Sequence, residues 1–234
     1  MSLAAVFLDL GNTLVSERAS RAALYADEAR RHGLEVDVER MQACMAAAHS
    51  FLPREIDGAF RYSDAWFRAF QRRIFVEDLG LDPAAFEELS ARLFERFEDA
   101  TTFVLYPGAR ALLAALRARG LKVGLVSNWS ARLPRLLAAL ELADSFDFVL
   151  GSAALRLEKP DAELFRTAVR RAGAPPERCL HAGDQLDRDA RGALSAGIAA
   201  VLVDHAGRFG AAERAVCPVV GSLPELQDLI LERA

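Results

Sequence analysis

The fold is decided by an apolar run that ends in a carboxylate, Ala4-Ala5-Val6-Phe7-Leu8-Asp9-Leu10-Gly11-Asn12-Thr13-Leu14. Residues 4–8 are apolar without alternation, which is typical of a strand covered on both faces in a parallel sheet. Gly11-Asn12-Thr13 then forms a turn signal. We therefore predict a buried strand over residues 4–9 that presents the carboxylate of Asp9 at the end of a sheet.

Strand and helix patterns alternate again after residue 104. Buried strands are predicted at residues 122–127, 146–150, 178–183 and 199–203, and a short one at 215–219. Helices are predicted between and after them, at residues 108–119, 133–142, 161–172, 189–196 and 223–232. Such alternation predicts an α/β fold, a Rossmann-like parallel sheet with helices on both faces.

Residues 17–100 have a different pattern, with four helical stretches at 18–32, 38–51, 63–79 and 83–98. No buried strand of the first kind is predicted among them. We expect an α/β core domain over residues 1–16 and 101–234, with residues 17–100 inserted as a helical cap domain. Because the insertion follows the Asp9 turn, it is a candidate lid over that turn.

Composition limits the classes of function. The 234 residues are 52% hydrophobic and 26% charged, as in an ordinary globular chain. The net charge of −4 argues against a nucleic-acid partner. No apolar run has membrane-spanning length, and no charged segment precedes the first apolar run as in a signal peptide. Three cysteines without disulfide or metal spacing fit a reducing compartment. We expect a cytoplasmic monomer or homodimer without a membrane partner.

Polar residues follow four of the predicted strands. Asp9 ends the first, Ser127-Asn128 the second, Lys159 follows the third, and Gly183-Asp184 ends the fourth. Ligands of open α/β sheets bind beyond the carboxyl ends of the strands, so these groups should meet there. Paired carboxylates suit Mg²⁺, while a hydroxyl, backbone N–H groups and a lysine suit a phosphate. The pattern predicts phosphoryl transfer, with Asp9 as a candidate nucleophile.

These motifs resemble the haloacid dehalogenase-like hydrolase superfamily, most of whose members are Mg²⁺-dependent phosphatases. The resemblance rests on residues 9–14, on Ser127-Asn128, on Lys159-Pro160-Asp161, and on residues 183–189 with the Gly-Ala and Ala-Gly pairs that follow. It covers about residues 1–16 and 104–210. Residues 17–100 match the position of the family's type 1 cap.

The resemblance implies a role for each matching residue. Asp9 would be the nucleophile and a metal ligand, Asp184 a second ligand, and Gly11 a ligand through its carbonyl. Asp189, or less favourably Asp187, would support the metal. Thr13, Ser127 and Lys159 would assist catalysis, and the substrate, a small phosphorylated molecule, would meet Asn128. Trp129 is a further candidate for the substrate pocket.

Gly11 departs from the family's pattern, because most of its phosphatases carry an aspartate there that protonates the leaving group. Its absence leaves three alternatives open. In the first alternative the protein is a phosphatase. Either another group replaces the acid, for which the candidates are His49, Glu55, Asp57 and Asp64, or the enzyme acts on activated phosphates. In the second alternative the protein is a dehalogenase in which Asp9 attacks carbon, although Gly183-Asp184 argues for an intact metal site. Or it is a catalytically weak binding module.

Overall fold

A computed structural model describes residues 2–234, which form two compact units. The first comprises residues 2–16, 105–129 and 140–234, and the second comprises residues 17–104 and 130–139. The sequence analysis placed all of residues 101–234 in the α/β domain. In the structure residues 101–104 and 130–139 group with the helical unit.

A six-stranded parallel sheet runs through the first unit within residues 2–234, in the order β10-β9-β8-β1-β6-β7. Its strands are β1 (Ala5–Leu8), β6 (Lys122–Ser127), β7 (Phe148–Gly151), β8 (Cys179–Gly183), β9 (Ala199–Val203) and β10 (Val219–Val220). All residues of β1 and β8 are buried, as the unbroken apolar pattern of residues 4–8 predicted for β1.

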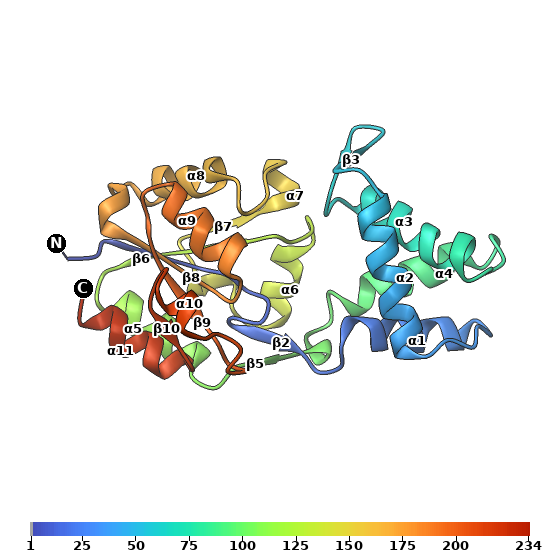
Figure 1. Cartoon of the computed structure of the whole chain (residues 1–234), viewed down its shortest axis with the longest axis horizontal. Coiled ribbons are helices and arrows are strands. Elements are labelled where there is room, and N and C mark those ends of the chain that lie inside the picture. The colour runs from blue at the N-terminus through green and yellow to red at the C-terminus, as the bar shows by residue number, and fades with distance from the viewer. Residues whose placement is uncertain (1) are drawn as a thin grey trace. The chain divides into compact units, whose positions relative to one another are not determined.

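Helices cover both faces of this sheet (Figure 1). On one face lie α8 (Ala162–Ala172) and α9 (Gly192–Ser195), whose Leu164 and Ala193 share a core with Phe7 and Val126 of the sheet. On the other lie α5 (Ala109–Ala118) and α11 (Leu223–Leu231). The short α7 (Ser152–Leu155) follows β7, and α10 (Ala211–Arg214) precedes β10. The predicted Rossmann-like α/β architecture is confirmed.

The direction in which strands are added reverses at β1. The chain continues from β1 to β6 and β7 on one side, and later strands are added on the other side of β1. Leu8 is the register partner of both Leu125 and Ala182, and the Asp9 N–H donates to the Ala182 carbonyl at 2.9 Å. The carboxyl ends of β1, β6 and β8 therefore meet at one edge, where α/β sheets bind ligands.

The second unit is helical and has a core of its own. Its helices are α1 (Arg21–Arg31), α2 (Val38–Phe51), α3 (Asp64–Arg72), α4 (Phe86–Arg96) and α6 (Leu133–Ala139), with a π-helical segment over Arg73–Asp78. Ser20, Asp37 and Ser63 cap the first three by accepting a backbone N–H. Trp66 is 1% exposed and stacks on Phe70 at 5.6 Å, so these aromatic residues form the core of the unit.

Short elements account for the differences from the predicted pattern. β2 (Val15–Glu17) pairs with β5 (Phe103–Leu105), and β3 (Glu55–Ile56) pairs with β4 (Ala59–Phe60). The strand predicted at residues 215–219 is wrong, because β10 begins only at Val219. Just before these residues, the Glu213 carboxylate accepts the Gly210 N–H at 2.9 Å and caps the start of α10, which ends at Arg214. Within residues 2–234, none of the helices has the length and apolar character needed to cross a bilayer.

Candidate active site

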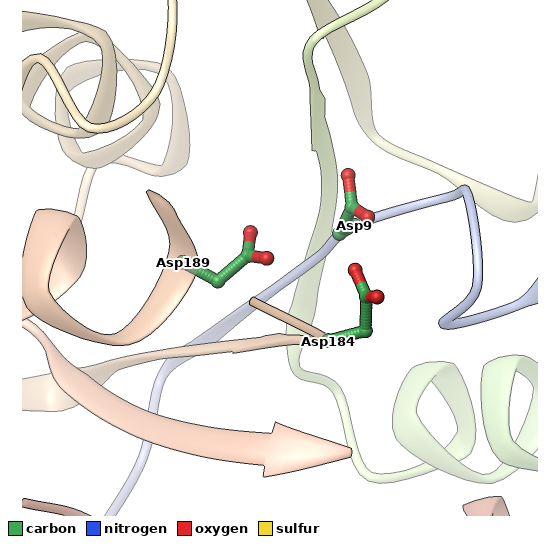
Figure 2. A group of neighbouring side chains, drawn as sticks. All are labelled: Asp9, Asp184 and Asp189. Carbon is green, nitrogen blue, oxygen red and sulfur yellow. The ribbon is translucent and has the colours of Figure 1, made fainter. Parts of the chain in front are cut away.

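Three buried carboxylates gather at the edge where β1 and β8 end (Figure 2). Asp9 follows β1, Asp184 follows β8, and Asp189 lies in the π-helical segment Leu186–Arg191 after β8. One oxygen of each carboxylate lies within 4.8 Å of the others. Charges so close and so well removed from water repel one another unless cations compensate them.

Lys159 supplies one such cation. Its Nζ lies 2.6 Å from Asp9 Oδ1 and 2.6 Å from Asp189 Oδ1, and its side chain is buried. Burial alone would lower the pKa of Lys159, but the two carboxylates outweigh burial and raise it above the ordinary value. Lys159 therefore stays protonated and holds two of the three carboxylates.

The two oxygens of Asp9 have different surroundings. Oδ1 accepts hydrogen bonds from Ser127 Oγ at 2.8 Å and from Lys159 Nζ. Oδ2 accepts none from the residues that the structure describes. Burial raises the pKa of Asp9, an effect that Lys159 opposes. One oxygen is thus fixed in place while the other is free to act as a nucleophile or a metal ligand.

Asp189 is fully engaged by the protein. Its Oδ1 also accepts from His181 Nε2 at 2.9 Å, and its Oδ2 accepts the Gln185 N–H at 3.0 Å. Burial would raise the pKa of Asp189, but Lys159 and His181 together lower it. A Cβ on Gly183 would lie 2.2 Å from Asp189 Cγ, so only glycine lets the carboxylate approach β8 so closely. Asp189 therefore remains ionised and fixed.

His181 is a site residue that the sequence analysis missed. It is fully buried within β8, and its Nδ1 has no hydrogen-bond partner among the described residues. We place a proton on Nε2, where it is donated to Asp189 Oδ1, because Nδ1 faces no acceptor among the described residues. The sequence feature that could have indicated it is a lone polar side chain inside the apolar strand 179–183.

Asp184 has weaker partners. Arg208 Nη2 lies 3.2 Å from its main-chain oxygen and 3.4 Å from Oδ2. Burial raises the pKa of Asp184 to about 6, and Asp9 and Asp189 add to the effect. Arg208 belongs to the loop after β9 and was also missed. Applying the strand-end argument to this fifth strand would have pointed to its loop.

The donor set fits Mg²⁺, which binds oxygen ligands and retains several waters. A divalent cation would relieve the repulsion from Asp9 and Asp189 that adds to the effect of burial on the pKa of Asp184. The Asp9 and Asp184 carboxylates are suited to direct coordination, whereas the engaged Asp189 suits support through water. The predicted Gly11 carbonyl ligand stays a prediction. Asp187, the less favoured alternative, lies outside the cluster with a 75% exposed side chain paired to Arg191.

Asn128 is bonded to the main chain of Lys159, and its predicted substrate contact stays a prediction. Its Oδ1 accepts the Lys159 N–H at 2.8 Å, and its Nδ2 donates to the Lys159 carbonyl at 3.1 Å. The side-chain amide thus positions the lysine. Thr13 is fully buried and its Oγ1 has no hydrogen-bond partner among the described residues, while its carbonyl bonds His205 Nε2 at 3.0 Å. Trp129 lies beside Gly11 and is half-buried.

Comparison with known proteins places this site in a family. The family model described as haloacid dehalogenase-like hydrolase matches residues 3–197. The chain belongs to the haloacid dehalogenase-like hydrolases. It is 33% identical to haloacid dehalogenase-like hydrolase domain-containing protein 3 of Bos taurus, over 95% of this chain and 90% of that protein. The predicted family membership is confirmed.

Two further proteins that are similar to this chain bear different activities in their names. A phosphoserine phosphatase of Thermus thermophilus is 32% identical, over 86% of this chain and 88% of that protein. The crystal structure of a 2-haloacid dehalogenase from Pseudomonas syringae pv. Tomato DC3000 superposes with a TM-score of 0.72 at 26% identity, covering 99% of this chain and 100% of that one. The names of these relatives therefore do not decide between a phosphatase and a dehalogenase.

Proposed function

We propose that the protein is a Mg²⁺-dependent phosphatase that acts on a small phosphorylated metabolite through an aspartyl-phosphate on Asp9. One observation carries the proposal: Asp9 has one oxygen fixed by Ser127 and Lys159, and it shares a cluster of three buried carboxylates with Asp184 and Asp189. Attack on carbon needs one carboxylate, whereas the approach of an anionic phosphate to three carboxylates requires a divalent cation.

The chain's own residues account for the steps of the reaction. Asp9 Oδ2 attacks phosphorus, the bond between phosphorus and the leaving-group oxygen breaks, and that oxygen departs with the electron pair. Lys159 and Ser127 hold Oδ1 during the attack. Water then attacks the phosphorus of the aspartyl-phosphate and releases inorganic phosphate with the free carboxylate. Bound Mg²⁺ would supply charge neutralisation at the phosphate.

Supporting roles follow from the geometry. Thr13 Oγ1 is a buried hydroxyl without a protein partner, in the turn after Asp9, and is available to a phosphate oxygen. Asn128 and His181 act indirectly, through Lys159 and Asp189. The helical unit would serve as the cap that selects the substrate, as its position in the chain suggests.

Dehalogenation is the second candidate, favoured by the likeness to a 2-haloacid dehalogenase and by the absence of a carboxylate at Gly11. It would need no Mg²⁺ and would leave Asp184 without a function. A binding module without turnover is a third candidate, and Gly11 is its only support.

The deciding experiment is a substrate panel with and without EDTA. We expect phosphate release from p-nitrophenyl phosphate or acetyl phosphate with Mg²⁺, and loss of that activity with EDTA or in Asp9→Asn. Asp187→Asn is the matched control, because Asp187 is an exposed carboxylate outside the cluster. Halide release from a 2-haloacid in EDTA, without phosphate release under any condition, would establish the dehalogenase instead.

A further inference from the structure

The indole of Trp129 lies against the residue two positions after the nucleophile. A Cβ built on Gly11 would be 3.3 Å from Trp129 Cζ3, closer than ordinary van der Waals contact. Gly11 is not among the residues with positive φ, so its backbone would accept any side chain. Space taken by the indole, and not backbone strain, therefore opposes a side chain at position 11.

The backbone around Trp129 is held in place from several directions. Its carbonyl accepts Ser152 Oγ at 3.2 Å and the Ala153 N–H at 3.2 Å, and Ser152 is fully buried at the start of α7. The preceding residue, Asn128, is bonded twice to the main chain of Lys159. The main chain of Trp129 is thus fixed to α7 and to the lysine, so a larger residue at position 11 would have to displace the half-buried indole about its own side-chain bonds.

The acidic and basic side chains near Asp9 are already engaged, and the unpartnered hydroxyl of Thr13 is too weak an acid to replace a carboxylic acid. Lys159 Nζ bonds two carboxylates, and both oxygens of Asp189 accept hydrogen bonds. Asp184 is placed for the metal. With no side chain on residue 11, the turn after Asp9 has no acid to protonate a departing oxygen. An alkoxide needs that proton, whereas a carboxylate or phenolate leaving group departs without it.

We infer that Trp129 is a specificity-determining residue: by filling the space beside Gly11, it excludes an acid from that position and restricts the enzyme to acyl and aryl phosphates. This inference rests on the proposed phosphatase function. It makes Gly11 and Trp129 a size-matched pair, because the size of the side chain at position 129 decides whether position 11 can hold an acid.

Four proteins test the pair: the wild type, Gly11→Asp, Trp129→Ala and the double variant. The measured quantity is the ratio of kcat/KM for glycerol 2-phosphate to that for p-nitrophenyl phosphate, which cancels damage common to both substrates. Positioned acid catalysis contributes about 10²–10⁴-fold, so we expect Gly11→Asp to raise the ratio at least about 10-fold in the Trp129→Ala background. We expect no rise in the wild-type background. An equal rise in both backgrounds, or none in either, would overturn the inference.

A second measurement needs no substrate and remains informative if the variants are inactive. The chain has two tryptophans, so Trp66→Phe leaves Trp129 as the sole indole. We expect Gly11→Leu to shift the Trp129 emission in that background. We also expect Gly11→Leu to lower the urea midpoint of the wild type more than that of Trp129→Ala. No shift and equal midpoint changes would overturn the packing of the pair. If the packing results hold but no protein cleaves either phosphate, the proposed function fails and the substrate class fails with it.

Discussion

At the scale of single residues, Asp184 destabilises the metal-free protein. Its pKa in the folded protein is about 6, against an ordinary value of 3.8. Between these values the unfolded chain releases the proton while the folded chain keeps it. Stability therefore falls as pH rises through this window and is level above about pH 6.

Replacing Asp184 by asparagine should therefore stabilise the metal-free protein. In EDTA at pH 7.5 we expect a gain of up to about 3 kcal/mol in the free energy of unfolding, because one pKa unit is worth about 1.4 kcal/mol. At pH 4 the gain should be small. Urea unfolding at both pH values checks this, with Asp187→Asn as the control. An equal gain at both pH values would show that the charge of Asp184 is not the cause.

His181 gives a prediction about positioning. Leucine at this site removes the donor to Asp189, whereas glutamine can still offer a side-chain N–H. A hydrogen bond to a charged group is worth about 1.5–3 kcal/mol, so we expect kcat of His181→Leu to fall about 10- to 100-fold. KM should change little, and His181→Gln should recover most of the loss. Equal activity of the two variants, with both folded, would contradict a positioning role.

The residues of the site differ in how far the sequence could predict them. Asp9, Ser127, Lys159 and Asp184 were predicted to meet because parallel strands end at one edge, and the structure brings them together. The bonds of Asn128 to the lysine main chain could not be predicted. They depend on which atom of a side chain faces which partner, and strand order does not determine that.

At the scale of the element, the position of the π-helical segment after β8 depends on Gly183. Alanine there would bring a methyl group to 2.2 Å from Asp189 Cγ, so either the strand or the carboxylate must move. We expect Gly183→Ala to lower kcat at least about 10-fold and to destabilise the protein by roughly 1–3 kcal/mol, the range for overpacking. Gly221→Ala is the control, since the nearest atoms to its Cβ lie 3.7 Å away. Wild-type activity in Gly183→Ala would show that Asp189 does not need this close approach.

The elements also show where sequence patterns stop being informative. Apolar runs such as residues 123–126 predicted strands correctly, because burial on both faces leaves an unbroken pattern. The pairs β2–β5 and β3–β4 were missed, since strands of two or three residues carry too little pattern and depend on their partner. The expected strand at residues 215–219 failed because residues 215–217 continue from α10, whose Ala211 and Glu213 carbonyls accept the Ala215 and Cys217 N–H groups.

At the scale of the whole molecule, the candidate site and the aromatic core belong to different units. The three carboxylates, Lys159 and His181 all belong to the α/β unit, while the helical unit has a separate aromatic core around Trp66 and Phe70. A ligand that binds only the folded state stabilises the part that forms its site. Each unit also holds one of the two tryptophans, so the unfolding of each can be followed separately.

We expect Mg²⁺ to raise the unfolding temperature reported by Trp129 in Trp66→Phe more than that reported by Trp66 in Trp129→Phe. At about 100 times Kd the ligand contributes about 2.7 kcal/mol, which corresponds to a shift of roughly 5–10 °C for a unit of this size. Adding Asp184→Asn should abolish the shift by removing a carboxylate of the cluster, and adding Asp187→Asn should preserve it. Equal shifts at both tryptophans would mean that the two units unfold as one, because the free energy of metal binding would then be shared by the whole chain.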